Sequence, residues 1–586
     1  MKLNHVKCYI KDYPRPQFVR RDWLNLSGEW DFVFDDANEG ENKKFYERFP
    51  KETRKITVPF SYLCKNSGIG DTARHDFLWY SRSLNIDAEK LSGCVNLIFE
   101  GSDYTTKVWA NGVLAGVHNG GCGRFSFDIT KLLKCGENTL VVKTEDDFRT
   151  DKPRGKQRWK NDNFGCWYEE TSGIYKTVWL DFTAAKAIKD VQIVPHYDEH
   201  LVEFVFSAPK GYTVCAEVER DGCKESCGYA EVNSAYTKLV LPIDAECEHW
   251  GMKPWTAGLY DVTFMLKDTD GNILDTVGSY FGFRKFEIIG DRLYFNDRPL
   301  YLKMLLDQGY WRDSHLTPPD EDAIVKDVIL TKEAGFNGIR KHQKLEDERF
   351  YYYCDILGVF VWAEMPSAYA FNENTVETVS AEWTSEVKQL RNHPSVMAWV
   401  PFNESWGVGG IHCDKTQQAF TESMYYLTKT LDGEKRPVIS NDGWEHTKSD
   451  IITIHNYAQY GERIIAEYKD KERALGSEVV NEWSGRSALA EGYKYEGQPV
   501  IISEFGGIAY SKDKKNGCWG YGDGVLDEKA YLERLKSLMD AIKALPYVCG
   551  YCLTQTTDVM QEVNGIVDME RTPKAALTEI KKINEA

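Results

Sequence analysis

The sequence predicts a multidomain protein in which two β-sandwiches precede a (β/α)8 barrel. The chain has 586 residues, more than one compact core accommodates, so two to four domains are expected. Segments of alternating apolar and polar residues, separated by Gly and Asn turns, run through its first half. In the second half, helical periods alternate with short apolar runs.

The first two domains are predicted from strand-like segments. Residues 17 to about 183 contain runs such as GEWDFVF and FLWYSRSLNI, whose alternation is typical of an antiparallel sandwich. A second β-rich stretch, 184–286, has the length of an immunoglobulin-like sandwich, about one hundred residues. We therefore place the first domain at 1–183 and the second, which we expect to be a spacer, at 184–286.

A barrel is predicted for residues 287–586. Helical stretches such as DEDAIVKDVILTKEAG and EKAYLERLKSLMDAIKAL alternate there with eight short apolar runs. Eight strands over this length fit a (β/α)8 barrel, whose active sites lie at the C-terminal ends of the strands. The predicted strands are 300–306, 337–340, 359–365, 396–402, 437–440, 451–455, 499–503 and 548–554.

Composition argues against two classes of partner. Ninety acidic against 72 basic residues give a net charge of −18, which repels phosphate backbones and anionic lipid. The sequence has no apolar run long enough to cross a bilayer, about 18 residues. We therefore expect neither nucleic acid nor membrane as a partner.

The N-terminus and the cysteines bear on the compartment. MKLNHVKCYIKDYPRP lacks the apolar core and cleavage site of a secretory signal, so a cytoplasmic location is expected. The 15 cysteines are odd in number and suggest no disulfide framework, so we expect mostly reduced thiols. Cys549 and Cys552 match the C-x-x-C spacing of zinc and redox sites, but on a strand they would point to opposite faces, which favours a structural role.

Polar side chains are concentrated where the predicted barrel strands end, more than strand ends carry by default. Two apolar runs, in WVPFNESWG and VIISEFGG, end in a glutamate, Glu404 after the fourth strand and Glu504 after the seventh. The strand-end set comprises Asp307, Arg340, His342, Glu364, Asn403, Glu404, Asn441, Asp442, His455, Asn456, Glu504, Gln555 and Asp558.

The two glutamates are candidates for an acid/base pair, because strands four and seven lie on opposite sides of a barrel mouth. Glycoside hydrolysis needs one acid to protonate the leaving oxygen and one carboxylate to attack or to activate water. A separation of about 5 to 5.5 Å would give retention of configuration, and about 6.5 to 9.5 Å would give inversion. On this pattern alone, a salt-bridge or helix-capping role is the competing interpretation.

Several stretches in order also resemble a known family. RPQFVRRDWLNLSGEWDF, FEGSDYTTKVWANGVLAGVHNGGCGRFSFDIT and PRGKQRWKNDNFGCWYEETSGIYKTVWL precede FNGIRKH, VWAEMPS, FNESWG and ISEFGG on the predicted barrel strands. Together they resemble glycoside hydrolase family 2, the β-galactosidase and β-glucuronidase family, over nearly the whole chain. The resemblance implies an N-terminal jelly-roll sugar-binding domain, an immunoglobulin-like sandwich and a catalytic TIM barrel.

The resemblance also implies residue roles. Glu404 would be the general acid/base and Glu504 the nucleophile of a retaining double displacement, and Asn403 would contact the sugar 2-hydroxyl. A cation and hydrogen-bond donors would keep the nucleophile ionised while the acid/base stays protonated. These neighbours of the nucleophile would be Arg340, His455, Asn456 and Tyr457.

Further substrate-binding residues are expected around this pair. Flat rings suit the C–H faces of pyranoses, so Trp406, Trp444 and Tyr551 are candidates for stacking on sugar, with core packing as the alternative. Arg340 and His342 have an ion pair and a core histidine as their alternatives. The expected substrate-binding set is Asn403, Asp307 as a hydroxyl acceptor, Arg340, His342, Glu364, Trp406, Asn441, Trp444, His455, Asn456, Tyr457 and Tyr551.

The stretch QEVNGIVD bears on sugar specificity. β-Glucuronidases of the resembled family carry an Asn-x-Lys element there that binds the substrate carboxylate, whereas this chain has Glu562 and Asn564 and no lysine. A glutamate repels an anionic sugar, so the expected substrate is a β-D-galactoside, from which exo cleavage releases the terminal sugar. An α-L-arabinopyranoside, with the same ring stereochemistry, and a β-glucuronide stay as alternatives.

Other functional classes are less favoured. A non-catalytic glycan-binding protein is the main alternative, because two of the three domains are sandwiches, but both carboxylates are retained. The sequence contains no G-x-S-x-G elbow, Gly-rich phosphate loop or H-E-x-x-H pair.

We expect no cofactor and no catalytic metal. The resemblance implies a homo-oligomer that acts on a small-molecule or oligosaccharide glycoside.

Overall fold

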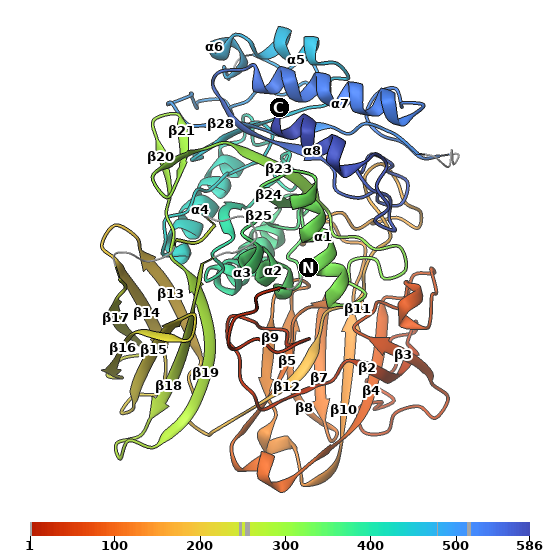
Figure 1. Cartoon of the computed structure of the whole chain (residues 1–586). Helices are drawn as coiled ribbons and strands as arrows, with labels where there is room; N and C mark the ends of the chain where they lie inside the picture. Colours follow the sequence, from red (N-terminus) through yellow and green to blue (C-terminus); the bar gives the residue numbers. More distant parts are fainter. Residues whose placement is uncertain (1–2, 245–248, 252–257, 478, 512–516) are drawn as a thin grey trace.

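Two β-layered units and one unit of alternating strands and helices make up the chain (Figure 1). The computed structural model describes residues 3–244, 249–251, 258–477, 479–511 and 517–586. In Figure 1 the first β unit (red to orange) and the second (yellow to green) lie side by side below the third unit (green to blue).

The first unit is a sandwich of two antiparallel sheets. Side chains from both, among them Trp30, Tyr80, Leu97 and Leu180, form its buried core. One sheet has the order β1 (Trp23–Asn25), β12 (Val178–Thr183), β5 (Cys94–Phe99), β9 (Phe125–Asp128); the other has β3 (Arg54–Val58), β2 (Gly28–Phe34), β4 (Phe77–Ile86), β10 (Gly136–Glu145), β7 (Thr105–Ala110), β8 (Val113–Asn119); β6 (Ser102–Asp103) pairs with β11 (Gly173–Ile174).

The second unit is a smaller sandwich around a core of its own. Its strands alternate as the sequence predicts: in LYDVTFMLK every second side chain is buried. One sheet has the order β13 (Asp190–His196), β14 (Leu201–Ser207), β17 (Tyr236–Pro242), and the other β16 (Cys223–Glu231), β15 (Thr213–Arg220), β18 (Leu259–Lys267), β19 (Ile273–Gly282).

The third unit follows a small antiparallel sheet of β20 (Phe286–Ile289), β21 (Arg292–Phe295) and β22 (Arg298–Leu300). Its seven strands are parallel and curl in the order β26 (Val396–Val400), β25 (Phe360–Glu364), β24 (Gly338–Lys341), β23 (Leu302–Asp307), β29 (Val548–Thr554), β28 (Val500–Gly506), β27 (Ile452–Asn456). The helices are α1 (Glu321–Glu333), α2 (Glu348–Leu357), α3 (Glu373–Leu390), α4 (Lys415–Asp432), α5 (Gly461–Tyr468), α6 (Lys471–Ala474), α7 (Glu528–Lys543) and α8 (Leu577–Glu585). The predicted multidomain architecture, with sandwiches before a barrel, is confirmed; the boundaries 1–183, 184–286 and 287–586 stay predictions.

The predicted strand 437–440 is the exception. This segment lies beside β26 in the fifth position but is joined to it by one isolated parallel bridge, Trp399 with Val438; a second bridge, Asn403 with Asp442, lies beyond the ends of both. Pro437 has no N–H to donate, and the N–H of Val438 donates to the Asp450 side chain (2.8 Å) instead of a neighbouring strand. A continuous ladder therefore does not form.

The ladder between β28 and β29 shifts register, with Val500 opposite Val548 but Ile502 opposite Tyr551. The extra residue in β29 changes the alternation of side chains beyond it. Cys549 and Cys552 consequently belong to the same buried cluster, so the prediction that they point to opposite faces is wrong. The 14 cysteines that the structure describes are all free thiols.

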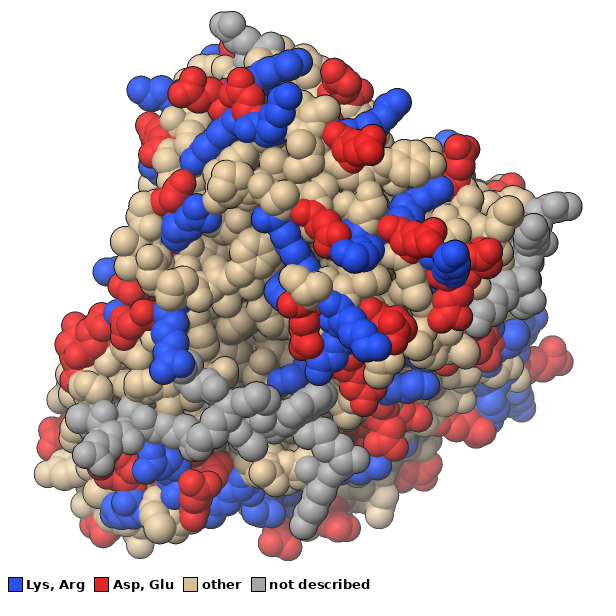
Figure 2. All heavy atoms as spheres, turned by 45° about the horizontal axis from the view of Figure 1, so that its top comes forward, with Lys and Arg blue, Asp and Glu red and all other residues tan. Residues whose placement is uncertain are grey.

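Two further observations concern partners. No helix in the described parts of the chain is long and apolar enough to cross a membrane. On the face drawn in Figure 2, Lys and Arg are intermingled with Asp and Glu, and the described residues form no extended basic area there.

Arg20, in the arm before β1, links the two β units. Its guanidinium donates to Asp181 of β12 (2.8 Å) and to both oxygens of Asp275 in β19 (2.9 and 2.8 Å). All three side chains are at most 8% exposed. A buried cation with two carboxylates thus holds the sandwiches together.

We expect Arg20→Met to destabilise the protein by about 3 to 5 kcal/mol, because it leaves two buried carboxylates without their cation. The readout is the first calorimetric unfolding transition, since a chain of several domains need not unfold in one step. The control is Lys43→Met, whose pair with Glu39 is 60% and 51% exposed and should contribute less than about 1 kcal/mol. Equally small shifts in both variants would contradict the role given to Arg20.

Candidate active site

The two strand-end glutamates meet at the mouth of the barrel. Glu504 belongs to β28, and Glu404 follows the last residue of β26, Val400, in the next loop. A carboxylate oxygen of Glu404 and one of Glu504 lie within 4.8 Å of each other. The Glu404 side chain is 15% exposed and that of Glu504 5%.

The backbone at Glu404 is unusual. Glu404 and Ser405 have φ values of +53° and +59°, in the left-handed region that residues other than Gly seldom adopt and that is enriched at functional sites. The Glu404 N–H donates to the Asp442 carbonyl (2.9 Å), and the Ser405 N–H donates to Oδ1 of Asn441 (2.9 Å). Asn441, a predicted binding residue, therefore supports the turn that carries Glu404.

Arg340, at the end of β24, is completely buried at the centre of the site. Its Nε donates to Glu364 (2.7 Å) and one terminal nitrogen donates to Oε1 of Glu504 (2.7 Å). The other terminal nitrogen donates to Oδ1 of Asn403 (2.7 Å) and lies 2.9 Å from Asp442. The guanidinium thus joins three strand-end carboxylates and one amide.

His455, in β27, lies between two carboxylates. Nδ1 is 2.8 Å from Oε1 of Glu404, and Nε2 is 2.8 Å from Oδ2 of Asp442. Burial alone would lower the pKa of His455, but the charges of Glu504 and Asp442 raise it to about 10. His455 is therefore an imidazolium at neutral pH.

The pKa of Glu404 departs from the expectation that this residue stays protonated. Burial would raise this pKa, but the hydrogen bond and charge of His455 lower it below its ordinary value. Contrary to that expectation, the lowered pKa of Glu404 and the raised pKa of His455 favour His455 as the holder of the proton between the two residues.

The remaining acids respond to burial differently. Burial raises the pKa of Glu364 to about 7, against the opposing charge of Arg340. Burial would also raise the pKa of Asp442, but Arg340 and His455 lower it well below its ordinary range. Burial and the adjacent Arg340 lower the pKa of His342, whose Nδ1 is 2.9 Å from Glu364.

Tyr457, just after β27, holds the second oxygen of Glu504. Its hydroxyl donates to Oε2 (2.6 Å), and its ring stacks on Tyr521 with centroids 3.4 Å apart. Each oxygen of Glu504 thus has its own donor, Arg340 or Tyr457, which orients the carboxylate.

Glu404, His455 and Glu504 are also a group with the ligand atoms of a cation site, all within 4.8 Å of one another. Nδ1 of His455 is already hydrogen bonded to Glu404, so a cation would have to displace this bond. The hydrogen bonds account for the three side chains without an ion.

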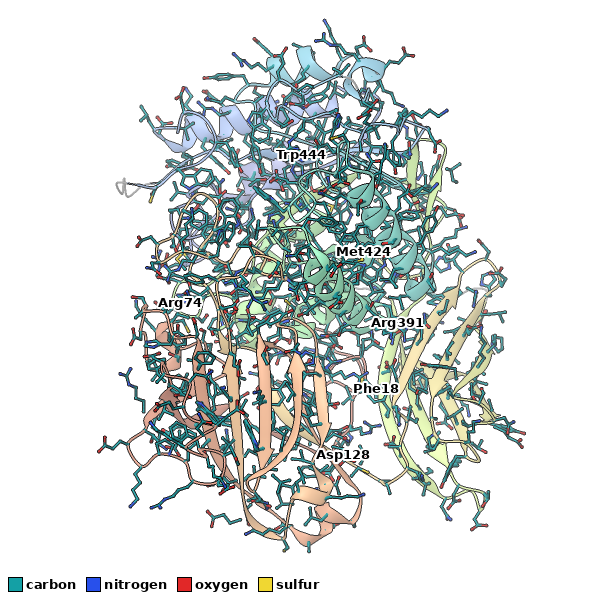
Figure 3. The ribbon with its side chains drawn as sticks, turned by 180° about the vertical axis from the view of Figure 1, so that it is seen from behind. Phe18, Arg74, Asp128, Arg391, Met424 and Trp444 are labelled. Atoms are coloured by element: carbon teal, nitrogen blue, oxygen red, sulfur yellow. The ribbon has the colours of Figure 1, made fainter. Side chains whose placement is uncertain are left out.

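The two predicted tryptophans border the site. The Trp406 indole N–H donates to Oε2 of Glu404 (3.3 Å). Trp444, labelled in Figure 3 within the barrel unit, directs its ring edge-on to His455 with centroids 5.5 Å apart. It also lines a cavity of about 480 Å³ with Tyr468 and Trp483.

The structure does not bring three predicted residues to this site. Asp307 accepts from Lys341 (2.7 Å), its cross-strand partner, and from the Gly309 N–H (3.0 Å). Asn456 donates away from the mouth, to Glu467 (2.8 Å) and to the Tyr468 hydroxyl (3.0 Å). Tyr551 donates to Asn584 of α8 and packs on Tyr301 and Phe505.

A loop of residues 152–171, whose contribution to the site was not predicted, extends from the first unit to the barrel mouth. Its N–H groups at Arg154 and Gly155 donate to the Ser367 carbonyl (2.9 and 3.1 Å). Lys156, 9% exposed, donates to Cys166 (3.3 Å), and its charge contributes to the lowered pKa of Glu404. The aromatic and basic residues of PRGKQRWKNDNFGCWYEE were the available signal.

Glu562 contacts this loop at Tyr168 and is 2% exposed. It accepts hydrogen bonds from the Tyr168 hydroxyl and from the Asn564 amide (2.8 Å). Burial raises its pKa, and the charge of Lys156 opposes the shift. The stretch expected to bear on specificity is thus joined to the loop from the first unit.

Comparison with known proteins gives matches over most of the chain. A model described as "Glycosyl hydrolases family 2, TIM barrel domain" matches residues 286–586, and one described as "Glycosyl hydrolases family 2, sugar binding domain" matches residues 24–183. A β-galactosidase of Pseudoalteromonas haloplanktis is 25% identical over 82% of this chain and 47% of its own length. A putative β-glucuronidase of Formosa agariphila is 24% identical over 85% of this chain and 58% of its own length. The chain spans about half the length of the curated relatives it matches.

Solved structures agree on the fold. A β-glucuronidase from Ruminococcus gnavus in complex with D-glucuronic acid superposes with a TM-score of 0.79 at 19% sequence identity, covering 99% of this chain and 100% of that one. At this identity the likeness concerns the arrangement of the chain and not its chemistry.

The raised pKa of His455 predicts a pH-dependent stability. Protonated His455 stabilises the folded state, and this stabilisation is complete below 6.5, the ordinary pKa of histidine. The stabilisation is lost as the pH rises through about 10, the pKa of His455 in the folded state. Compared with the His455→Asn variant, the native protein should lose stability between these limits at up to about 1.4 kcal/mol per pH unit. Denaturant unfolding at several pH values measures the difference, and parallel curves for the two proteins would contradict it.

Proposed function

Because the chain belongs to glycosyl hydrolase family 2, whose two domain models match it at residues 24–183 and 286–586, we propose that it is a retaining glycosidase that releases one terminal sugar. The observation that carries the proposal is the pair Glu404 and Glu504, of which one carboxylate oxygen each lies within 4.8 Å of the other. This spacing supports retention, since retaining enzymes have carboxyl groups about 5 to 5.5 Å apart.

Glu504 is the proposed nucleophile. Its carboxylate attacks the anomeric carbon and forms an ester as the bond to the leaving oxygen breaks, while Glu404 gives that oxygen a proton. Glu404, now ionised, then takes a proton from the water that attacks the same carbon and frees Glu504. Arg340 and Tyr457 hold the nucleophile at 2.7 and 2.6 Å.

The proton for the leaving oxygen is shared by Glu404 and His455. While His455 holds it, Glu404 is a carboxylate; a bound substrate buries Glu404 further, raises its pKa and favours transfer from Nδ1 to Oε1 over their 2.8 Å contact. Asp442 keeps its hydrogen bond to Nε2 in both states. Glu404 is thus the proposed acid/base, and His455 is the residue that supplies its proton.

Asn403 supplies a donor for the sugar. Its Oδ1 is taken by Arg340 (2.7 Å), whereas Nδ2 is buried and has no partner among the described residues. An unpaired buried donor is costly, so a sugar 2-hydroxyl that accepts from Nδ2 stabilises the complex.

The proposed sugar is a neutral β-D-galactoside, because the stretch QEVNGIVD offers Glu562 and Asn564 and no lysine to an anionic sugar. An α-L-arabinopyranoside has the same ring stereochemistry. The second candidate is a β-glucuronide, which Lys156 favours: this nearly buried ammonium has no carboxylate paired with it in the described part of the chain and can neutralise a uronate. A homo-oligomeric state and a cytoplasmic location stay predictions.

Initial rates on p-nitrophenyl β-galactoside, β-glucuronide, β-mannoside, β-glucoside and both α-L-arabinosides distinguish these sugars. We expect one neutral sugar to be preferred and Glu504→Ala to lose about three or more powers of ten in kcat. The control is Tyr229→Ala, which alters a 73% exposed side chain of the second unit. Preference for the glucuronide would support the second candidate, and no hydrolysis of any would contradict the proposed function.

The role of Glu404 predicts a dependence on the leaving group. A leaving group that departs without protonation needs no acid, so Glu404→Ala should slow formation of the ester by several powers of ten for a methyl glycoside but much less for a dinitrophenyl glycoside. Pre-steady-state rates measure that step. An equal loss on both substrates would argue against Glu404 as the acid.

A further inference from the structure

Five aromatic side chains form a continuous array beside Glu404. Neighbouring ring centroids are 4.4 to 5.6 Å apart, and each of the five residues is partly exposed. The array reaches the site through Trp406, whose indole N–H donates to Oε2 of Glu404 (3.3 Å). Its members are Trp159, Phe164, Trp167, Tyr369 and Trp406.

Two units of the protein build this array. Trp159, Phe164 and Trp167 come from the loop 152–171 of the first unit, and the other two come from barrel loops. The units are docked closely: the Tyr369 N–H donates to the Thr150 carbonyl (2.7 Å), and a Cβ at Gly155, whose φ is +62°, would overlap the Gln343 carbonyl. The array is therefore fixed relative to Glu404.

The array offers ring surface and one buried donor without a hydrogen-bond partner among the described residues, the indole N–H of Trp167. The Tyr369 hydroxyl donates to the Gly155 carbonyl (2.5 Å), and the Gln561 amide donates to the carbonyls of Gly165 (2.9 Å) and Trp167 (3.2 Å). The Trp406 N–H is occupied by Glu404. A sugar, whose hydroxyls need hydrogen-bond partners, fits this surface less well than an aromatic ring does.

The array also leads outward. At Phe164 it borders an open cavity of about 420 Å³, which Trp519 and Gln561 also line. A ring lying along the array thus has an apolar surface on one side and solvent beyond it.

We propose that this array is the leaving-group subsite and that it takes an aromatic aglycone. The inference rests on the proposed function, in which Glu404 protonates the leaving oxygen, so the side chains that border the Glu404 carboxylate flank the departing group. Trp167 and Trp159 then bind the aglycone ring by stacking and have no part in bond breaking.

The test uses phenyl and methyl 1-thio-β-D-glycosides of the sugar that is hydrolysed, galactose first, because thioglycosides report binding without chemistry. In Trp167→Ala the inhibition constant of the phenyl compound should rise about tenfold, and that of the methyl compound less than about twofold. Trp159→Ala is a second variant should the first fold poorly. Trp167→Phe should restore most of the affinity, and Tyr229→Ala should change neither constant.

The outcomes separate the two proposals. A selective loss for the phenyl compound supports the aromatic subsite. Equal changes for both compounds, or none, overturn it while hydrolysis of the simple glycoside continues. Failure to hydrolyse any glycoside overturns the proposed function itself. A disaccharide that loses affinity in Trp167→Ala where the phenyl compound does not would make the array a sugar subsite and overturn the aromatic assignment.

Discussion

Arg340 holds the strand ends of the barrel mouth together by charge. It is completely buried and donates to Glu364 at the end of β25 and to Glu504 in β28, and it pairs with Asp442 in the segment that replaces a strand. A buried cation is tolerated only when its partners surround it, so these elements have one arrangement in which the guanidinium is satisfied. This arrangement also positions the two glutamates of the site, because Glu504 accepts a hydrogen bond from Arg340 and the Glu404 N–H donates to the Asp442 carbonyl.

The same cluster explains where protons reside. Four carboxylates, those of Glu364, Glu404, Asp442 and Glu504, face two cations, Arg340 and His455. An excess of buried negative charge raises the pKa of whatever base is nearby, and His455, raised to about 10, takes up a proton that an isolated imidazole would have released. Glu364, with its pKa raised to about 7, is the next to bind one. A proton beside Glu404 is thus a consequence of charge balance, and the chemistry proposed for Glu404 uses it.

Local patterns predicted most of the barrel and the core of the site. An apolar run followed by a polar residue marks a strand end without knowledge of the fold, which is why Arg340, Glu404, His455 and Glu504 were found. The errors come from what such patterns lack. The pairing of Asp307 with Lys341 depends on register between β23 and β24, and the orientation of Tyr551 follows the register shift in β29. The aromatic loop 152–171 reaches the mouth only because two units dock, which no short stretch of sequence specifies.

In the proposed mechanism Glu504 forms a covalent bond to the sugar. A 2-deoxy-2-fluoroglycosyl fluoride of the hydrolysed sugar tests it most directly, because the fluorine weakens the transition-state contact at position 2 and the intermediate accumulates. We expect the mass of the protein to rise by one fluorosugar and peptide mapping to place this sugar on Glu504. An adduct on another residue, or none on a protein that hydrolyses the parent glycoside, would contradict it.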